Sequence, residues 1–260
     1  MSLKNWDNKT WLSSKKYIQS FLIFLLKQIK LKKDSQILDI GCGRGKIIGT
    51  LFSKLRLRYR PIGIDLERHK DRDKRFSFKR IHAISYLKQN KKKYDLILIK
   101  QTIHFLNFND IKRLLFLCKK SLKDGGKILI FTLETSNNEI PTFPLMRRKL
   151  RFSLNRDKKM IRFISKLYPK IKKRKFLFKV KISKNNYIKM IKNRYISTLL
   201  DLSSNEILKG INEIQLKYKK MLNFNDKLTC LIIDKQLKFL KGSLFRSPTK
   251  RAPLSRLIGI

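Results

Sequence analysis

The sequence is almost without two of the commonest small apolar residues. Its 260 residues include two alanines, Ala83 and Ala252, and one valine, Val180. Isoleucine is abundant instead, although valine and isoleucine are both β-branched and have similar structural preferences. Folding physics does not explain this replacement, but a coding bias toward AT-rich codons does. The same bias would raise lysine along the whole chain.

Acidic residues are also scarce. The chain has 18 Asp and Glu against 64 Lys and Arg, which gives a formal net charge of +46. A strongly basic chain often binds nucleic acid. Here, however, the basic residues are spread along the whole sequence, as the coding bias predicts. The charge therefore permits an RNA partner without establishing one.

Cysteines and long apolar runs are few. Cys42, Cys118 and Cys230 are odd in number and far apart, so they predict neither a disulfide framework nor a metal cluster. The longest apolar run near the N-terminus, Phe21–Leu26, is too short to cross a bilayer and follows about twenty mostly polar residues. We therefore expect a reduced, cytoplasmic protein with no metal and no membrane partner. The oligomeric state is left open.

The most informative stretch is QILDIGCGRGKIIGTL, residues 36–51. A short apolar run, Ile37–Ile40, predicts a buried parallel strand, and Lys46 begins a helical pattern. Between them stand Gly41, Gly43 and Gly45. A strand, a glycine turn and a helix together bring bare backbone close to a ligand.

Two carboxylates accompany these glycines. The spacing G-x-G-x-G differs from the G-x-G-x-x-G of dinucleotide-binding folds, and Asp39 precedes the first glycine by two positions. A carboxylate there suits a ligand that carries an ammonium group better than an anion. Asp65 ends a second strand-like run, residues 60–65, about twenty residues further on. A βαβ unit places there an acid that binds both ribose hydroxyls; a solvated loop aspartate is the alternative.

The pattern Asp39-x-Gly41-x-Gly43-x-Gly45 resembles the first motif of class I S-adenosylmethionine-dependent methyltransferases. The resemblance implies a doubly wound, mostly parallel, seven-stranded Rossmann-like α/β sheet with helices on both faces. It also implies a helical cap inserted after the fifth strand. S-adenosylmethionine would be the cofactor, held by the glycine turn and Asp65. Recognisable motifs extend over residues 36–133, more than a third of the chain.

The N-terminal segment resembles one subgroup of this family. WDNKTW, residues 6–11, precedes a helix expected over Tyr17–Leu31, as in the trans-aconitate-methyltransferase-like (methyltransferase type 11) group. There an aromatic residue lies close to the cofactor, which makes Trp11 our candidate in a helical lid of residues 1–34. In the alternative interpretation, Trp6 and Trp11 only cover the edge of the core.

Three further residues complete the predicted site. A third strand, Phe76–Ala83, ends in His82 and Ala83, where many methyltransferases carry an aspartate for the adenine amino group. A neutral His82 nitrogen or the Ala83 backbone amide would replace that contact. The strand Tyr94–Ile99 should lie beside the glycine-turn strand, and Lys100 at its end is a further cofactor-binding candidate.

His104 follows the same strand and is the catalytic candidate, because its ordinary pKa suits acid–base work near neutrality. The alternative is a histidine packed where the next helix begins. The Asn/Asp-Pro-Pro-aromatic motif of methyltransferases that act on the amino groups of adenine or glutamine is absent here. That absence argues against that subclass.

The second half of the chain is basic and mainly helical. We expect a helix over Asn109–Ser121 capped by Asn109 or Asp110, a turn over residues 122–126 and a fifth strand over residues 127–133. Further along lie a strand over residues 176–182, two helices within residues 187–218 and a last antiparallel edge strand over residues 227–235. The resulting division is a lid (1–34), a cofactor-binding core (35–135), a cap that includes one core strand (136–225), a final strand (226–240) and a basic tail (241–260).

These expectations combine into a functional hypothesis. The chain would transfer a methyl group to a small-molecule acceptor, a carboxylate or a hydroxyl. Cap arginines, Arg147, Arg148 or Arg194, would hold a carboxylate bidentately. The alternative is an RNA methyltransferase whose basic cap holds phosphates, and a third class is a cofactor-fold protein that only binds a partner.

Overall fold

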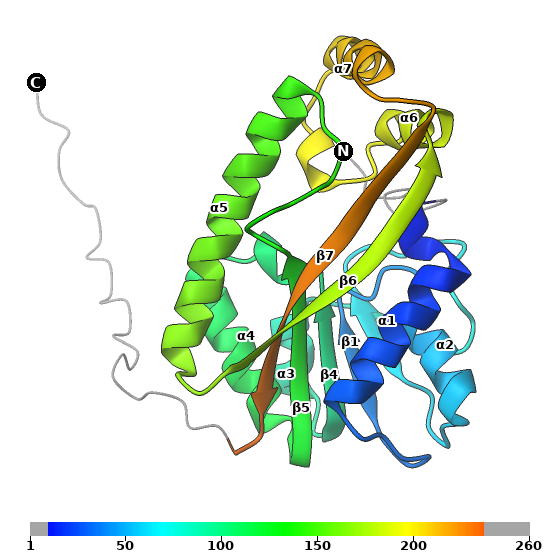
Figure 1. Cartoon of the computed structure of the whole chain (residues 1–260). Coiled ribbons are helices and arrows are strands. Elements are labelled where there is room, and N and C mark those ends of the chain that lie inside the picture. Colours follow the sequence, from blue (N-terminus) through cyan, green and yellow to red (C-terminus); the bar gives the residue numbers. More distant parts are fainter. Residues whose placement is uncertain (1–9, 237–260) are drawn as a thin grey trace, which may run out of the picture.

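The computed structural model describes residues 10–236. A seven-stranded sheet forms its centre, with strand order β3-β2-β1-β4-β5-β7-β6 (Figure 1). The strands are β1 (Ile37–Ile40), β2 (Ile62–Asp65), β3 (Ser77–Arg80), β4 (Tyr94–Lys100), β5 (Leu122–Leu133), β6 (Lys172–Ser183) and β7 (Met221–Asp234). Strand β7 is antiparallel to both its neighbours, and the pairs among β1 to β5 are parallel. The predicted mostly parallel, doubly wound sheet is confirmed.

Helices cover both faces of this sheet. The helices are α1 (Lys15–Gln28), α2 (Lys46–Leu55), α3 (Ala83–Gln89), α4 (Phe108–Lys120), α5 (Pro144–Leu167), α6 (Lys184–Lys192) and α7 (Ser204–Lys217), with short 3₁₀ turns η1 (Trp11–Ser13), η2 (Ile103–Phe105) and η3 (Ser197–Leu199). Along β4, Leu96 and Leu98 join the core under α1 and α2, while Ile97 and Ile99 join the core under α3, α4 and α5. The strand is apolar on both faces because both faces are covered.

The cap lies beyond the carboxyl ends of the parallel strands. It consists of α6, η3, α7, the first turns of α5 and the far ends of the long β6–β7 pair, which rise out of the sheet (Figure 1). Its second long helix, α7, begins at Ser203, whose hydroxyl accepts the Glu206 backbone N–H while the Glu206 side chain accepts that of Ser203. This capping box fixes where the helix begins.

Several sequence-based boundaries were wrong. The last strand is not the edge of the sheet: β7 lies between β5 and β6, so the edge strand is β6. The stretch of residues 122–126 belongs to β5, because Leu122 pairs with Tyr94 before a register irregularity. The cap of α4 is Asn107, whose side chain accepts the Asp110 N–H at 2.8 Å.

Two more differences concern the ends of strands. Strand β3 stops at Arg80, and Ala83 starts α3 instead of ending the strand. Strand β7 starts at Met221 rather than at residue 226. Trp6 and the tail beyond residue 241 lie outside the described residues.

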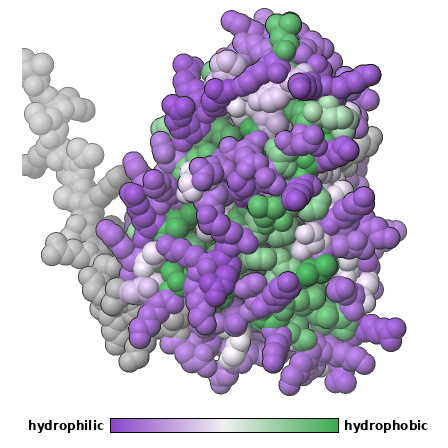
Figure 2. Space-filling model, viewed as in Figure 1, coloured by the Kyte–Doolittle hydropathy of each residue, from purple (hydrophilic) through white to green (hydrophobic). Residues whose placement is uncertain are grey.

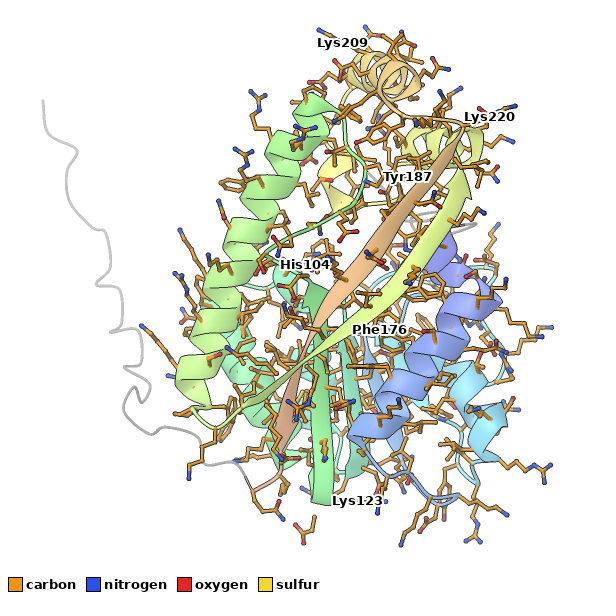
Figure 3. The ribbon with its side chains drawn as sticks, in the orientation of Figure 1. His104, Lys123, Phe176, Tyr187, Lys209 and Lys220 are labelled. Atoms are coloured by element: carbon orange, nitrogen blue, oxygen red, sulfur yellow. The ribbon has the colours of Figure 1, made fainter. Side chains whose placement is uncertain are left out.

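Hydrophilic side chains are spread over the visible surface rather than gathered in one stripe (Figure 2). Lys209 and Lys220 project from the cap, while Lys123 projects from the opposite end of the molecule (Figure 3). This spread fits a compositional origin of the charge. No described helix is long and apolar enough to cross a membrane.

Candidate active site

The glycine turn between β1 and α2 has the backbone that its sequence demands. Gly41, Gly43 and Gly45 have φ angles of 71°, 51° and 65°, which L side chains rarely adopt. A Cβ on Gly41 would lie 2.0 Å from the Thr102 hydroxyl, and one on Gly45 would lie 2.1 Å from the Phe76 ring. These two glycines therefore permit close packing of the turn on its neighbours.

Gly43 differs from the other two. A Cβ added there would meet no described atom within 4 Å. Its backbone N–H instead donates to the Asp65 carboxylate at 2.8 Å, and Asp65 also accepts the Glu67 N–H at 3.1 Å. Gly43 thus borders open space, and Asp65 is held beside it at the end of β2 with acceptor capacity left.

Asp39 is buried at the end of β1, 4% exposed, just before the turn. Burial raises the pKa of Asp39 to about 7; Lys100 lowers it and Asp65 raises it further. A buried carboxylate of this kind is stabilised by a cation placed next to it.

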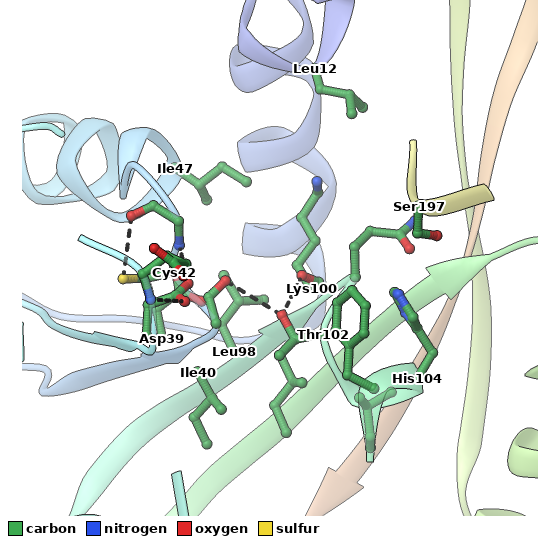
Figure 4. A pocket seen from close by; sticks show the side chains of 18 of the residues that line it. Leu12, Asp39, Ile40, Cys42, Ile47, Leu98, Lys100, Thr102, His104 and Ser197 are labelled. Atoms are coloured by element: carbon green, nitrogen blue, oxygen red, sulfur yellow. Dashed lines mark hydrogen bonds between the residues drawn. The ribbon is translucent and has the colours of Figure 1, made fainter. Parts of the chain in front are cut away.

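Lys100 lies at the end of β4, half-buried, with its ammonium 5.5 Å from the centre of the Tyr17 ring. Burial lowers the pKa of Lys100, whereas the carboxylates of Asp226 and Asp39 raise it. In Figure 4 its side chain extends away from the sheet, between Asp39 on one side and His104 on the other. Lys100 therefore interacts electrostatically with two buried acids, Asp226 and Asp39.

Trp11 is buried, and its position in η1 is fixed by the cap. Its indole N–H donates to Asp226 on β7 at 3.0 Å. Its ring packs edge-on against Tyr195 and Phe224, with centroids 5.3 and 5.2 Å away. Trp11 thus covers one side of the cavity while joining the N-terminal segment to the cap, which the sequence alone did not show.

All ten sequence-predicted site residues line one cavity of about 540 Å³ at the carboxyl ends of the strands. They are Trp11, Asp39, Gly41, Gly43, Gly45, Asp65, His82, Ala83, Lys100 and His104. His82 is exposed and directly precedes α3, and Ala83 is the first residue of that helix. The sheet explains this convergence, since the carboxyl ends of parallel strands meet at one edge.

His104 lies in η2, at the other end of the cavity from Asp39 (Figure 4). Both of its ring nitrogens are buried and have no hydrogen-bond partner among the described residues. Burial, with a contribution from nearby Arg156, lowers the pKa of His104 to about 4. The imidazole is therefore neutral at pH 7, and its nitrogens are available to a ligand.

Asp157 on α5 is a lining residue that the sequence-based prediction missed. It is 4% exposed, and its Oδ1 has no hydrogen-bond partner in the described part of the chain. Burial raises the pKa of Asp157 to about 6, and Arg156 lowers it. The sequence did contain a signal, because Asp157 is the only acid among twenty basic residues between positions 147 and 194.

The expected role of the cap arginines is wrong for this structure, because none of the three lines the cavity. The Arg194 guanidinium donates to the carbonyls of Leu199 and Leu202, which braces the loop before α7. Arg147 donates to the Thr142 hydroxyl at 3.4 Å. Arg148 is exposed on α5.

Comparison with known proteins agrees with this geometry. Residues 38–128, which extend from β1 into β5, match the family model described as a methyltransferase domain. Together with the strand order and the glycine turn, this match identifies residues 38–128 as a class I S-adenosylmethionine-dependent methyltransferase domain. S-adenosylmethionine is the cofactor of that class. No curated protein matches the sequence.

Solved structures share the fold at low sequence identity. One is a protein from Anabaena variabilis described as a methyltransferase of an antibiotic biosynthesis pathway, with 12% identity, TM-score 0.55, and coverage of 81% of this chain and 95% of that one. Another is an S-adenosylmethionine-dependent methyltransferase from Geobacter sulfurreducens in complex with S-adenosyl-L-homocysteine, with 14% identity, TM-score 0.50, and coverage of 85% and 91%. The resemblance to the trans-aconitate-methyltransferase-like group stays a prediction.

Proposed function

We propose that this chain methylates a small-molecule acceptor, with the cofactor on the glycine turn and the acceptor on the His104 side of the same cavity. The cofactor supplies an electrophilic methyl group on a sulfonium sulfur. Open space at Gly43 and the buried carboxylate of Asp39 fit such a ligand. Asp39 attracts its ammonium group, and Asp65 accepts hydrogen bonds from its ribose hydroxyls.

The remaining lining residues complete the proposed cofactor site. His82 and the Ala83 backbone contact the adenine, and Lys100 lies beside Asp39 and offsets part of its charge. Trp11 closes the cavity on the lid side and excludes water, which favours a displacement between two bound reactants. The segment of residues 1–34, of which the structure describes residues 10–34, acts as a lid, and that of residues 136–225 acts as a cap.

The observation that carries the small-molecule assignment is the charge of the cavity wall. Among the described residues, five acids line the cavity: Asp39, Asp65, Glu67, Asp157 and Asp226. Three Lys or Arg do so, Arg44, Lys46 and Lys100, although the chain has 64 against 18 acids. An acidic wall disfavours a polyanion, and a cavity of about 540 Å³ has the size of small-molecule sites, roughly 300–1,000 Å³.

Two measurements test the proposal. Calorimetry should show that the protein binds S-adenosylhomocysteine, and that Asp65→Ala weakens binding by about 1.5–3 kcal/mol, the contribution of hydrogen bonds to a charged group. Tritiated methyl groups from S-adenosylmethionine should then appear in the small-molecule fraction of a cell extract. Label confined to RNA, or no binding of S-adenosylhomocysteine by the folded protein, would contradict the proposal.

A further inference from the structure

The acceptor end of the cavity has an unusual charge for this chain. Its lining residues come from η2, α5 and the loop before and within η3: residues 103–106, Ser153, Asp157 and residues 195–197. None of these nine residues is Lys or Arg, although twenty Lys and Arg stand between positions 147 and 194. The one acid of that stretch, Asp157, faces the cavity, while its basic neighbours Arg156, Lys158 and Lys159 are exposed.

Two polar side chains at this end, Asp157 and His104, have buried atoms without a hydrogen-bond partner among the described residues. Asp157 is 4% exposed with Oδ1 unpartnered, and both nitrogens of His104 are buried without partners among the described residues. Leaving a buried carboxylate without a hydrogen bond or a counter-ion costs free energy. A ligand with N–H donors and positive charge would offset that cost, whereas a carboxylate ligand would add like charge beside Asp157.

Arg156 does not supply the missing partner of the Asp157 carboxylate. Its guanidinium donates to the Leu106 carbonyl at 3.1 Å, which ties α5 to the chain directly after η2. The arginine is exposed and forms no ion pair with Asp157 in the described structure. This hydrogen bond between α5 and the chain after η2 instead holds Asp157 and His104 on adjoining walls of the cavity, although their two segments are about fifty residues apart in the sequence.

From this arrangement we propose that the methyl acceptor is an amine, and that Asp157 binds its ammonium group with His104 as a second hydrogen-bond acceptor. This proposal rests on the methyltransferase function proposed above and replaces the expected carboxylate or hydroxyl acceptor. Phe105, which lines the cavity and is 51% exposed, together with Ile103 and Ile196, provides apolar surface for the rest of the acceptor.

The transfer step balances with these groups. An alkylamine enters as an ammonium ion, because its ordinary pKa is about 10. One proton passes to the Asp157 carboxylate, which frees the nitrogen lone pair. The nitrogen forms a bond to the methyl carbon, and the carbon–sulfur bond breaks with its electron pair on sulfur. The products are the N-methylammonium ion and S-adenosylhomocysteine, and Asp157 then releases its proton to water.

A matched set of probes tests the charge preference without knowledge of the natural acceptor. Benzylamine, benzyl alcohol and benzoate share one ring and differ in the group that Asp157 would meet. Calorimetry on the full chain saturated with S-adenosylhomocysteine should show benzylamine binding at least tenfold tighter than benzoate. Asp157→Asn should weaken benzylamine by about tenfold to a hundredfold, the loss expected for a charge-assisted hydrogen bond, and leave benzyl alcohol unchanged.

The control variant is Lys158→Gln, an exposed neighbour on the same helix, which should leave all three affinities unchanged. Preferred binding of benzoate, no benzylamine binding at millimolar concentration, or equal benzylamine affinity in the wild type and Asp157→Asn overturns the amine assignment. In each case retained S-adenosylhomocysteine binding shows that only this inference has failed. Loss of that binding in the wild type removes the proposed function itself.

Discussion

At the scale of single residues, the three glycines of the turn have separable roles. A side chain at Gly41 or Gly45 would collide with Thr102 or Phe76, whereas a side chain at Gly43 would enter open space. All three have positive φ, so an alanine at any of them is strained by about 1–2 kcal/mol. Packing and backbone conformation thus account for Gly41 and Gly45, whereas at Gly43 the positive φ favours glycine and the open space is where we propose that the cofactor binds.

We expect Gly43→Ala to weaken S-adenosylhomocysteine binding at least tenfold, because its methyl group would occupy space that the ligand needs. Gly125→Ala is the matched control: φ there is 75°, its added Cβ meets no described atom within 4 Å, and it lies at the far end of β5. Both variants should lose similar stability, measured by chemical denaturation. Equal ligand affinity in the two variants would place the cofactor elsewhere.

Gly45→Ala should be more destabilising than either. Its Cβ would lie 2.1 Å from the Phe76 ring, so an overpacking cost of about 1–3 kcal/mol adds to the backbone strain. The same denaturation experiment measures it. A stability equal to that of Gly43→Ala would mean that Phe76 moves aside freely.

The raised pKa of Asp39 predicts how the affinity for S-adenosylhomocysteine depends on pH. Because its pKa in the free protein is raised to about 7, the carboxylate is increasingly protonated below that pH and no longer attracts an ammonium group. The affinity for S-adenosylhomocysteine should therefore fall as pH decreases below 7, approaching about tenfold per pH unit. Asp39→Asn should bind more weakly at pH 8 and show a flatter profile. Parallel profiles for the two proteins would exclude Asp39 as the ammonium partner.

The raised pKa of Asp39 has the opposite effect on folding stability: stability falls as pH rises, whereas ligand affinity increases. The folded pKa of Asp39 lies above the ordinary value of about 3.9 in an unfolded chain, so protonation favours the folded state. This contribution is fully present below pH 4 and is lost as pH rises toward 7. The ligand-free wild type should therefore lose stability over this interval relative to Asp39→Asn.

At the scale of elements, the hydrogen bond from Trp11 to Asp226 joins η1 to β7 across most of the chain. Trp11→Phe keeps an aromatic ring but leaves a buried carboxylate with one partner fewer. We expect a loss of about 1–3 kcal/mol in the free energy of unfolding. A double-mutant cycle with Asp226→Asn, measured by denaturation, should show coupling. Strict additivity of the two substitutions would mean that the contact does not hold the N-terminal segment in place.

At the scale of the whole molecule, the main question is whether the net positive charge serves a function or reflects a coding bias. The basic residues cover both ends of the molecule, while the cavity wall carries five acids among the described residues (Figure 3). A coding bias raises the number of lysines at surface positions, where their side chains are solvated. Selection for a ligand acts on the cavity, where charge has a larger effect because it is less screened.

RNA binding should therefore be weak and should disappear at physiological salt, with no preference among RNAs. Reversal of Lys172, Lys173 and Arg174 to glutamate should leave S-adenosylhomocysteine affinity unchanged, because all three are exposed on the edge strand β6. Lys175 is best left in place, since its ammonium lies 3.5 Å from the buried Glu134. RNA binding that survives physiological salt, prefers one RNA and is lost in the reversal variant would contradict this expectation.

The sequence by itself determined the core and the glycine-turn side of the cavity. A strand, a glycine turn and a helix are encoded within sixteen consecutive residues, and Asp65 follows at a fixed distance in the same βαβ unit. Such local patterns can be recognised in a sequence because residues that are neighbours in the chain are also neighbours in space. His104 and Lys100 were found the same way, from the end of a readable strand.

Apart from His104, the other side of the cavity, where we propose that the acceptor binds, was decided by the tertiary structure. Asp157 meets the cavity because α5 packs beside η2, and Asp226 meets Trp11 because β7 inserts between β5 and β6. The long helix α5 is strongly basic, and although Asp157 stands out as its one acid, the sequence does not show that this residue faces the cavity. Contacts between segments that are distant in the chain depend on how the cap folds back onto the sheet. A sequence pattern does not show which of these segments come together in space.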